Sequence, residues 1–257
     1  MAAPKDTNKS TTALRSFHVL ETVAQSDVPL PVAQVAANAG LDRATCYRML
    51  KTIEQAGYVV HDPISNTYRL SRKILTLARN LLAQDESREM INASLRALSR
   101  GTKETCHYSE LDGFQTVLTQ LSKGTQLVAV DFRIGTQSPL HITSVGKAIL
   151  AFQSREFIDS YLERELERST ENTIATPEKL LDELRTIRDA GISYDHEEMA
   201  LGMNCVAVPV FQPDGQVLSG ISISGPDSRF TEDYLAFLGQ ALRDEANRLQ
   251  QTLAGLS

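Results

Sequence analysis

The first part of the chain contains apolar positions at helical spacing that predict three short helices. The first helix begins at Thr12 and ends before Asp27, and the second begins at Pro31, a residue suited to a first helical turn. Asp42 is a favourable N-cap for a third helix, which we expect over Arg43–Gln55. The turn between the second and third helices is tight and contains a glycine able to close a helix.

Two apolar runs after the third helix predict strands at 58–61 and 67–70, separated by the turn-forming residues 62–66. Three helices with a tight turn before the third, followed by a hairpin, form a winged helix-turn-helix. The order and the short spacings are more specific than any single element.

The remaining sequence alternates between strand and helix patterns. Residues 71–84 predict a connector helix, and 85–100 predict the first helix of a second domain. The later elements we expect are strands at 105–111, 115–120 and 127–132, a helix at 144–165 broken near 153–154, a helix over Pro177–Ala190, a hairpin of 206–211 with 217–224, and a closing helix within 227–253. Strand hairpins interrupted by helices predict an α+β domain with an antiparallel sheet flanked by helices.

These patterns divide the chain into four parts. We expect a disordered polar tail at 1–11, the winged helix-turn-helix at 12–71, the connector helix at 72–85, and a larger domain at 86–257.

Composition limits the class of protein. The chain has 257 residues, of which 42% are hydrophobic and 23% charged, and this is ordinary globular usage. No apolar run reaches the length of a membrane span, and the polar N-terminus lacks a secretory signal. Cys46, Cys106 and Cys205 are widely spaced, which argues against a disulfide framework and for the cytoplasm. We expect no cofactor and no metal site.

Charge is distributed unevenly along the chain. Residues 1–75 carry nine Lys and Arg against six Asp and Glu, a net charge of +3. The rest carry 17 against 26, a net of −9, so that the whole chain has −6. A small basic segment joined to a larger acidic one indicates that only the first meets a polyanion.

The third helix has the division of faces that a DNA-reading helix needs. The side that we expect to pack carries Ala44, Tyr47, Leu50 and Ile53. On the other side, we expect Arg43, Thr45 and Arg48 to face the major groove. Phosphate contacts are expected from Arg15, Lys51 and Arg69. The alternative is an ordinary amphipathic surface helix.

Two segments of the second domain suit a small anion. Ser144 and Val145 open a helix, where unpaired amides and the positive end of the dipole favour negative charge. Ser222 and Ser224 are two apart on a strand, so both hydroxyls face the same side, while the isoleucines between and before them face the core. The alternative is that these hydroxyls bond backbone or water.

The sequence resembles a known family. TTALRSFHVLETV, LDRATCYRMLKTIEQAGYV and YRLSRKILTLA resemble the DNA-binding domain of the isocitrate-lyase-regulator (IclR) family of bacterial transcription factors. PLHITSVGKAILA, GISYDHEEMALGMNCVAVPV and GQVLSGISISGP resemble its effector-binding domain. The resemblance implies a GAF-like effector domain, a pocket for a small organic acid, often aromatic or a central metabolite, and homodimers that pair into tetramers.

The family's functional positions transfer residue by residue. The resemblance implies that the amides of Ser144 and Val145 bind the ligand carboxylate, although relatives carry smaller residues there. It also implies ligand contacts from Asp195, Cys205, Ser222 and Ser224. We expect an apolar wall from Val130, Phe132 and Leu140, and a polar contact from either His107 or Tyr108.

Three other interpretations use the same residues. Asp195, His196 and Cys205 are the residue types of a Cys-His nucleophile, but their spacing does not specify that geometry. His196, Glu197 and Glu198, with His141, could ligate a metal, although consecutive side chains diverge. Cys205 could also be a small buried hydrophobe.

We therefore expect a cytoplasmic regulator that represses or activates transcription. Its partners are double-stranded operator DNA, a small carboxylate effector and further copies of the chain, with no membrane. The alternative function is a metabolite-binding enzyme whose N-terminal domain is only a partner interface.

Overall fold

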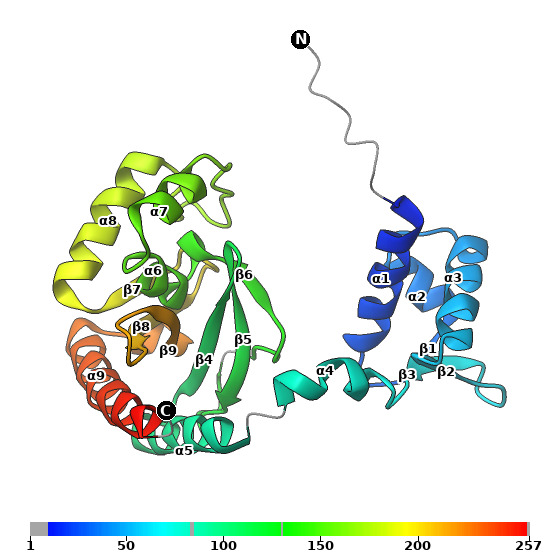
Figure 1. The fold of residues 1–257 in the computed structure, drawn as a ribbon, viewed down its shortest axis with the longest axis horizontal. Coiled ribbons are helices and arrows are strands. Elements are labelled where there is room, and N and C mark those ends of the chain that lie inside the picture. The colour runs from blue at the N-terminus through cyan, green and yellow to red at the C-terminus, as the bar shows by residue number, and fades with distance from the viewer. Residues whose placement is uncertain (1–9, 83–84, 130, 256–257) are drawn as a thin grey trace, which may run out of the picture. The chain divides into compact units, whose positions relative to one another are not determined.

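The computed structural model describes residues 10–82, 85–129 and 131–255, and divides the chain into two compact units, Met1–Gln84 and Asp85–Ser257 (Figure 1). Most of the predicted tail lies outside the described residues. The first helix begins one residue earlier than predicted, at Thr11, because the Ser10 hydroxyl accepts a hydrogen bond from the Ala13 amide and caps it.

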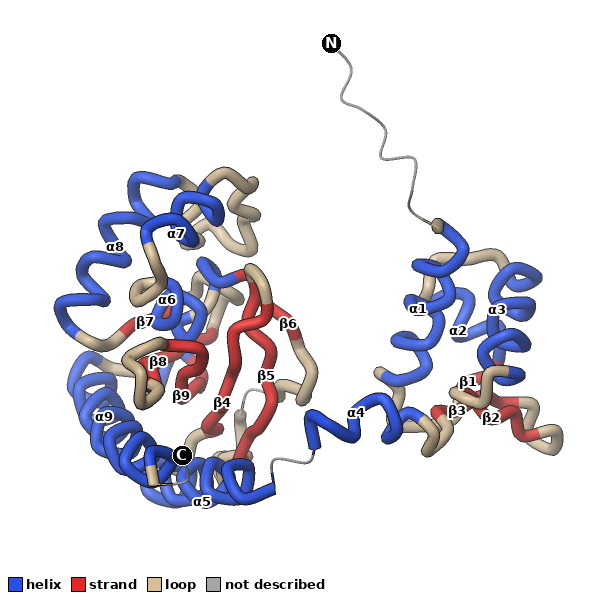
Figure 2. The backbone as a smooth tube through the Cα atoms, in the orientation of Figure 1, coloured by secondary structure: helices blue, strands red, loops and turns tan. Residues whose placement is uncertain are grey.

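Unit 1 is a winged helix-turn-helix, as predicted. Its elements in chain order are α1 (Thr11–Ala24), β1 (Leu30–Pro31), α2 (Val32–Asn38), α3 (Arg43–Gln55), β2 (Val59–Asp62), β3 (Thr67–Leu70) and α4 (Ile74–Leu82). The three strands form an antiparallel sheet in the order β1-β3-β2 (Figure 2). The Asp42 carboxylate accepts from the Thr45 amide at 2.9 Å and fixes the predicted start of α3.

The buried face of α3 differs from the predicted one. Its buried side chains are Cys46, Met49, Leu50 and Ile53, which pack with residues of α1 and α2. Ala44 is exposed and Tyr47 is 47% exposed, so the prediction that these two residues pack was wrong. The helix is rotated so that the larger apolar stripe, which includes Cys46 and Met49, meets the core.

Unit 2 is built around one antiparallel sheet in the order β6-β5-β4-β9-β8-β7. Its elements are α5 (Asp85–Thr102), β4 (Thr105–Asp112), β5 (Gln115–Ser122), β6 (Gln137–Pro139), the 3-10 turn η1 (Leu140–Ile142), α6 (Ser144–Leu150), α7 (Arg155–Leu162), α8 (Pro177–Ala190), β7 (Ser193–His196), β8 (Met203–Phe211), β9 (Val217–Pro226), the 3-10 turn η2 (Asp227–Arg229) and α9 (Glu232–Ala254). The predicted helices and hairpins are confirmed with small shifts at their ends.

The two faces of this sheet have different roles. Ile221 and Ile223 of β9 join a core formed with leucines of α5 and α9, the two helices that lie along one face (Figure 1). Their strand neighbours Ser222 and Ser224 face the other side, which α6 partly covers. Period-two alternation therefore separates an apolar core from a polar site.

One predicted strand is absent. The described residues of the segment 127–132 form no strand, and Leu127 and Val128 are exposed. The Val128 carbonyl oxygen instead accepts a hydrogen bond from the Arg229 guanidinium at 3.0 Å. Phe132, further along the loop, instead packs edge-on against His107.

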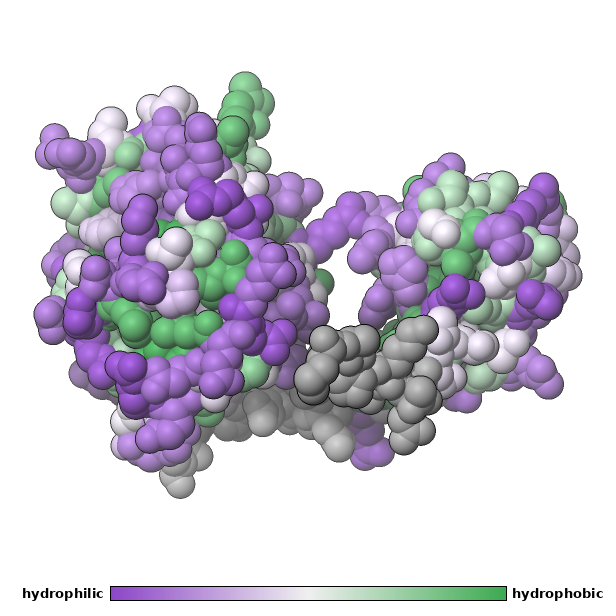
Figure 3. Space-filling view, turned by 90° about the horizontal axis from the view of Figure 1, so that it is seen from above, coloured by the Kyte–Doolittle hydropathy of each residue, from purple (hydrophilic) through white to green (hydrophobic). Residues whose placement is uncertain are grey.

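The molecular face in Figure 3 is mainly hydrophilic, with apolar patches on both units. The exposed large hydrophobic residues of unit 1 include Leu14, Phe17, Leu75 and Leu77. Among the described helices, none is long and apolar enough to cross a membrane.

Candidate functional site

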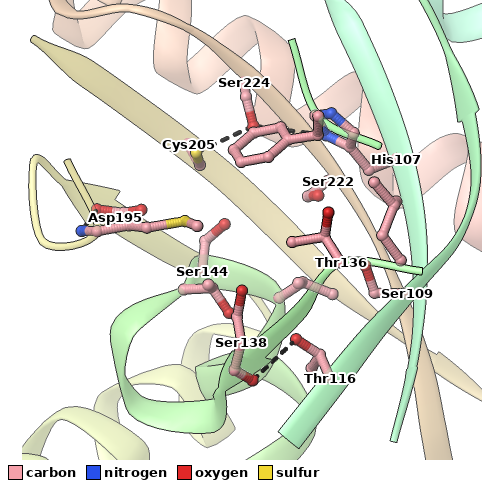
Figure 4. A pocket seen from close by; sticks show the side chains of 15 residues that line it. His107, Ser109, Thr116, Thr136, Ser138, Ser144, Asp195, Cys205, Ser222 and Ser224 are labelled. Atoms are coloured by element: carbon pink, nitrogen blue, oxygen red, sulfur yellow. Dashed lines mark hydrogen bonds between the residues drawn. The ribbon is translucent and has the colours of Figure 1, made fainter. Parts of the chain in front are cut away.

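A cavity of about 50 Å³ lies in unit 2 between the sheet, the start of α6 and the loop before β6 (Figure 4). Most of its lining side chains carry hydroxyl groups. The lining residues are His107, Ser109, Thr116, Leu118, Phe132, Thr136, Ser138, Thr143, Ser144, Val145, Asp195, Met199, Cys205, Ser222 and Ser224. This described lining contains no lysine or arginine, so polar recognition depends on neutral donors and one carboxyl group.

A row of hydrogen bonds crosses the floor of the cavity. The Ser224 hydroxyl lies 3.0 Å from the Cys205 sulfur and 3.5 Å from Nδ1 of His107 (Figure 4). Burial raises the pKa of the Cys205 thiol well above its ordinary value, and the carboxyl of Asp195 raises it further. Cys205 is therefore a protonated thiol, which contributes a weak donor and an apolar surface.

His107 is the residue that faces the cavity, and Tyr108 faces away. The Tyr108 hydroxyl donates to the Ser219 hydroxyl at 2.9 Å on the core side of the sheet. Burial lowers the pKa of His107 to about 4, so its imidazole is neutral at pH 7. Its Nε2 atom is buried and has no partner within the described chain.

Asp195 is fully buried on β7 and has one bonded and one free oxygen. Oδ1 accepts from the Glu198 amide at 2.7 Å and, more weakly, from the Met199 amide at 3.4 Å. Oδ2 has no partner among the described residues. Desolvation raises the pKa of Asp195 to about 7, and the nearby Glu198 carboxylate adds to the rise. The carboxyl group therefore exchanges a proton near neutral pH.

The nearest lysine is occupied elsewhere. Lys147 of α6 is buried, and its Nζ donates to Glu198 at 2.6 Å and to Glu183 of α8 at 3.2 Å. Thr173 donates to the Glu198 carbonyl at 2.7 Å. This network fixes the turn that follows Asp195, and it keeps the ammonium group outside the cavity lining.

Two glycines allow the start of α6 to pack closely, Gly146 against the turn η1 and Gly220 between α6 and the sheet. A Cβ at Gly146 would collide with the carbonyl oxygen of Leu140, and one at Gly220 would lie 2.8 Å from Val145 Cγ2. The amides of Ser144 and Val145 are the first of α6 and have no partner within the helix. Both residues line the cavity, and Figure 4 shows the Ser144 side chain in the same cavity as Ser222 of β9.

The cavity brings together most of the residues expected there. Its lining includes Phe132 from the expected apolar wall. It also includes all six residues that were expected to make polar contacts with the ligand through a side chain or a backbone amide: Ser144, Val145, Asp195, Cys205, Ser222 and Ser224. Leu140 is not part of the lining, because η1 turns its side chain into the separate cluster formed with α7 and α8. Its expected place in the apolar wall was wrong. Val130 lies outside the described residues.

Sequence reasoning missed seven lining residues: Ser109, Thr116, Leu118, Thr136, Ser138, Thr143 and Met199. Ser109 and Thr116 could have been found from strand alternation, once the inward face of β4 and β5 was known. Thr136 and Met199 lie on connections, where no periodicity marks an inward side chain.

The nucleophile and metal interpretations find no support in the positions of the histidines. His196 is exposed and stacks on Tyr194, on the strand position after Asp195 and therefore on the opposite face from Cys205. His141 is held by the Tyr161 hydroxyl at 2.6 Å and by the Glu167 carbonyl at 2.8 Å. The described residues contain no group of three or more His, Cys, Asp or Glu that could hold a metal ion.

In unit 1, the polar candidates lie on accessible surface. Arg43 and Arg48 of α3 are exposed, whereas Thr45 is half-buried and its hydroxyl accepts from Arg48 Nη2 at 3.3 Å. Arg15 and Arg69 are exposed on α1 and β3. Lys51 forms an ion pair with Glu54 at 2.8 Å, so part of its charge is already neutralised.

Comparisons with known proteins assign both units to one family. The family model "Bacterial transcriptional regulator IclR C-terminal" matches residues 80–251, and the IclR helix-turn-helix domain matches 12–63. The HTH-type transcriptional regulator KdgR of Escherichia coli is 33% identical over 244 residues, which cover 93% of this chain and 92% of KdgR.

Solved structures share the fold. The IclR protein of Thermotoga maritima superposes with a TM-score of 0.76 at 29% identity, covering 95% of this chain and 98% of that one. An IclR homolog of Microbacterium hydrocarbonoxydans, crystallised with 4-hydroxybenzoate, has a TM-score of 0.77 at 21% identity, covering 95% and 100%. The protein is a DNA-binding transcriptional regulator with an effector domain. It belongs to the IclR family.

Proposed function

We propose that this regulator responds to a small hydroxylated carboxylic acid, which binds in the unit 2 cavity and changes the affinity of unit 1 for operator DNA. The observation that carries the proposal is the cavity lining, in which hydroxyl-bearing side chains and the first two residues of α6 accompany Asp195, whose Oδ2 is buried without a partner among the described residues. To change DNA binding, the acid must bind with different affinity to the conformation that binds DNA and to the one that does not.

The carboxylate is assigned to the side of the cavity formed by α6 and β9. Unpaired amides at a helix start favour an anion, and neutral hydroxyls can donate to it. Ser222 is buried and lines the cavity, so its hydroxyl can form a hydrogen bond with a ligand oxygen. Burying such a group without a partner is unfavourable, which a bound carboxylate would remedy.

The ligand's hydroxyl group is assigned to Asp195. Oδ2 of Asp195 is buried without a partner, and it suits a hydroxyl donor better than a second carboxylate. A cavity of about 150 Å³ holds benzene, so a volume of about 50 Å³ favours a compact aliphatic acid in this conformation. The fold relative crystallised with 4-hydroxybenzoate carries a ligand of the same hydroxy-acid class.

On the DNA side, we propose that Arg43, Thr45 and Arg48 contact base edges, and that Arg15, Lys51 and Arg69 contact phosphates. The exposure of the four arginines on one winged helix-turn-helix supports this arrangement. One such unit makes few contacts, so we propose that a homodimer, paired further into a dimer of dimers, binds a two-fold operator.

Calorimetric titration of the full chain tests the effector site. We expect binding of glycolate or lactate, weaker binding of 4-hydroxybenzoate, and little binding of the methyl esters, because esterification removes the charge. Ser222→Ala should weaken acid binding by about 1–3 kcal/mol, the cost of losing a hydrogen bond to a charged group. Fluorescence anisotropy with DNA from upstream of the protein's own gene then measures the response to the acid.

Ser219→Ala is the matched control, since Ser219 lies on the same strand but bonds Tyr108 on the opposite face. It should leave acid binding unchanged. Equal affinity for an acid and its methyl ester, or undiminished affinity in Ser222→Ala, would remove the anion site from this proposal.

A further inference from the structure

Tyr47 stands on the exposed face of α3, beside the residues proposed to face DNA. Its side chain is 47% exposed, and no described residue forms a hydrogen bond with its hydroxyl. Ala44 lies three residues before Tyr47, Arg48 directly follows it, and both side chains are exposed. Positions i, i+3 and i+4 of a helix share one face, so these three side chains form a continuous surface.

This surface combines an apolar half with a cationic half. The Tyr47 ring and the Ala44 methyl group are apolar, and Arg48 supplies the guanidinium group. Lys51 Nζ lies 5.9 Å from the centre of the Tyr47 ring and is held by Glu54 at 2.8 Å. Lys51, on the next turn of the helix, therefore lies beside the Tyr47 ring. The rest of the ring is exposed to solvent and can contact a ligand.

We infer that Tyr47, with Ala44 beside it, reads a thymine 5-methyl group in the major groove. The inference depends on the assignment of α3 as the helix that enters the groove. Among the four bases only thymine presents a methyl group there, and apolar side chains recognise it. Burying half of an aromatic ring against this methyl group removes apolar surface from water on both partners.

A second contact is compatible with the same position. Tyrosine hydroxyls also donate to phosphate oxygens, which fixes register and conveys no sequence information. The two contacts can be tested separately. Replacing thymine by deoxyuridine removes only the methyl group that the ring would contact, and Tyr47→Phe removes only the hydroxyl that would contact a phosphate.

The test uses the full chain and a duplex operator enriched from random sequences with the wild-type protein. Each thymine is replaced in turn, in both half-sites, by deoxyuridine, which lacks only the methyl group. For wild type we expect one symmetric thymine whose replacement weakens binding about fourfold per half-site, the equivalent of one buried methyl group. Tyr47→Phe should keep that penalty. Tyr47→Ala should bind more weakly and should lose the penalty at this position.

Two variants serve as controls, with thermal melting to check that each one folds. Val28→Ala shortens an exposed hydrophobic residue outside α3 and should behave as wild type. Arg48→Ala should weaken binding while the methyl penalty remains. The inference is wrong if Tyr47→Ala keeps the wild-type penalty at every thymine, or if Tyr47→Phe loses as much affinity as Tyr47→Ala.

The outcomes also separate this inference from the assignment on which it depends. An enriched operator that lacks a thymine in its half-sites would overturn the role of Tyr47 and leave DNA binding intact. If the wild-type chain enriches no duplex at all, DNA reading by α3 fails, and the role of Tyr47 fails with it.

Discussion

Asp195 and His107 line the same cavity, and burial shifts their pKa values in opposite directions, so that the carboxyl group has the higher pKa of the two. Desolvation disfavours the charged form of each group, so the pKa of Asp195 rises to about 7 and that of His107 falls to about 4. Two strands, β8 and β9, separate them in the sheet, and both project to the cavity side. Near neutral pH the cavity therefore holds a neutral imidazole and a carboxyl group that is partly protonated.

These shifts predict opposite effects on stability. Between pH 4 and 7 the folded chain keeps the Asp195 proton that the unfolded chain releases, so Asp195 lowers the free energy of unfolding as pH rises. Between pH 6.5 and 4 the folded chain excludes the proton that unfolded His107 binds, so His107 lowers that free energy as pH falls. At about 1.4 kcal/mol per pKa unit, the effect is on the order of 4 kcal/mol for Asp195 and 3 kcal/mol for His107.

Urea unfolding at several pH values between 4 and 7.5 measures both. Asp195→Asn lacks the contribution that stabilises wild type at low pH, so its free energy of unfolding should fall relative to wild type as the pH is lowered. His107→Gln lacks the contribution that stabilises wild type at high pH, so its free energy of unfolding should fall relative to wild type as the pH is raised. Asp189→Asn, which changes an exposed carboxylate, should follow the wild-type profile. Parallel profiles for all four proteins would contradict the assigned burial of the two cavity groups.

At the scale of elements, Lys147 connects α6 to α8 and to the turn after β7. Its ammonium group is buried and pairs with Glu198 at 2.6 Å and Glu183 at 3.2 Å. Burial raises the pKa of Glu198, and the Lys147 charge opposes that rise. The amide of Glu198 also donates to Asp195, so the same contacts hold the cavity's carboxyl group in place.

A double-mutant cycle tests this connection. Lys147→Met leaves the Glu198 carboxylate buried without its cation and should cost about 3–5 kcal/mol of unfolding free energy. Adding Glu198→Gln removes the uncompensated charge and should recover a large part of that loss. If the double variant loses the sum of the two single effects in urea unfolding, the two side chains are not coupled.

At the scale of the whole molecule, the proposal requires more than one copy of the chain. The basic unit is small, with a net charge of +3 over residues 1–75, and one α3 reads a short site. Leu75 and Leu77 of α4 are 55% and 61% exposed, which is unfavourable for a helix facing only water.

We expect light scattering to show a dimer or a larger assembly of the wild-type chain at micromolar concentration. Replacing Leu75 and Leu77 by Ser should shift the population towards monomer and weaken operator binding, with the thermal stability of each unit nearly unchanged. A wild-type monomer that binds operator DNA tightly would contradict a dimeric reading of two half-sites.

Local chemistry was sufficient to predict several elements from the sequence alone. The helices Arg43–Gln55 and Pro177–Ala190 were predicted with their observed ends, because Asp42 caps the first and Gly191, at a φ of 66°, closes the second. The side of β9 that carries Ser222 and Ser224 followed from the period of two in a strand. These features depend on residues within a few positions of one another.

Tertiary contacts decided the rest. The apolar residues of α3 fit two adjacent faces of the helix, one that includes Ala44 and Tyr47 and one that includes Cys46 and Met49. Packing with α1 and α2 buries the second face. The segment 127–132 had a strand-like composition, but its described residues form no strand, and the Val128 carbonyl accepts a hydrogen bond from Arg229. The pKa of Asp195 likewise depends on desolvation by segments far apart in the sequence. Sequence periodicity specifies which residues share a face, whereas the partner that covers this face is set by contacts between distant segments.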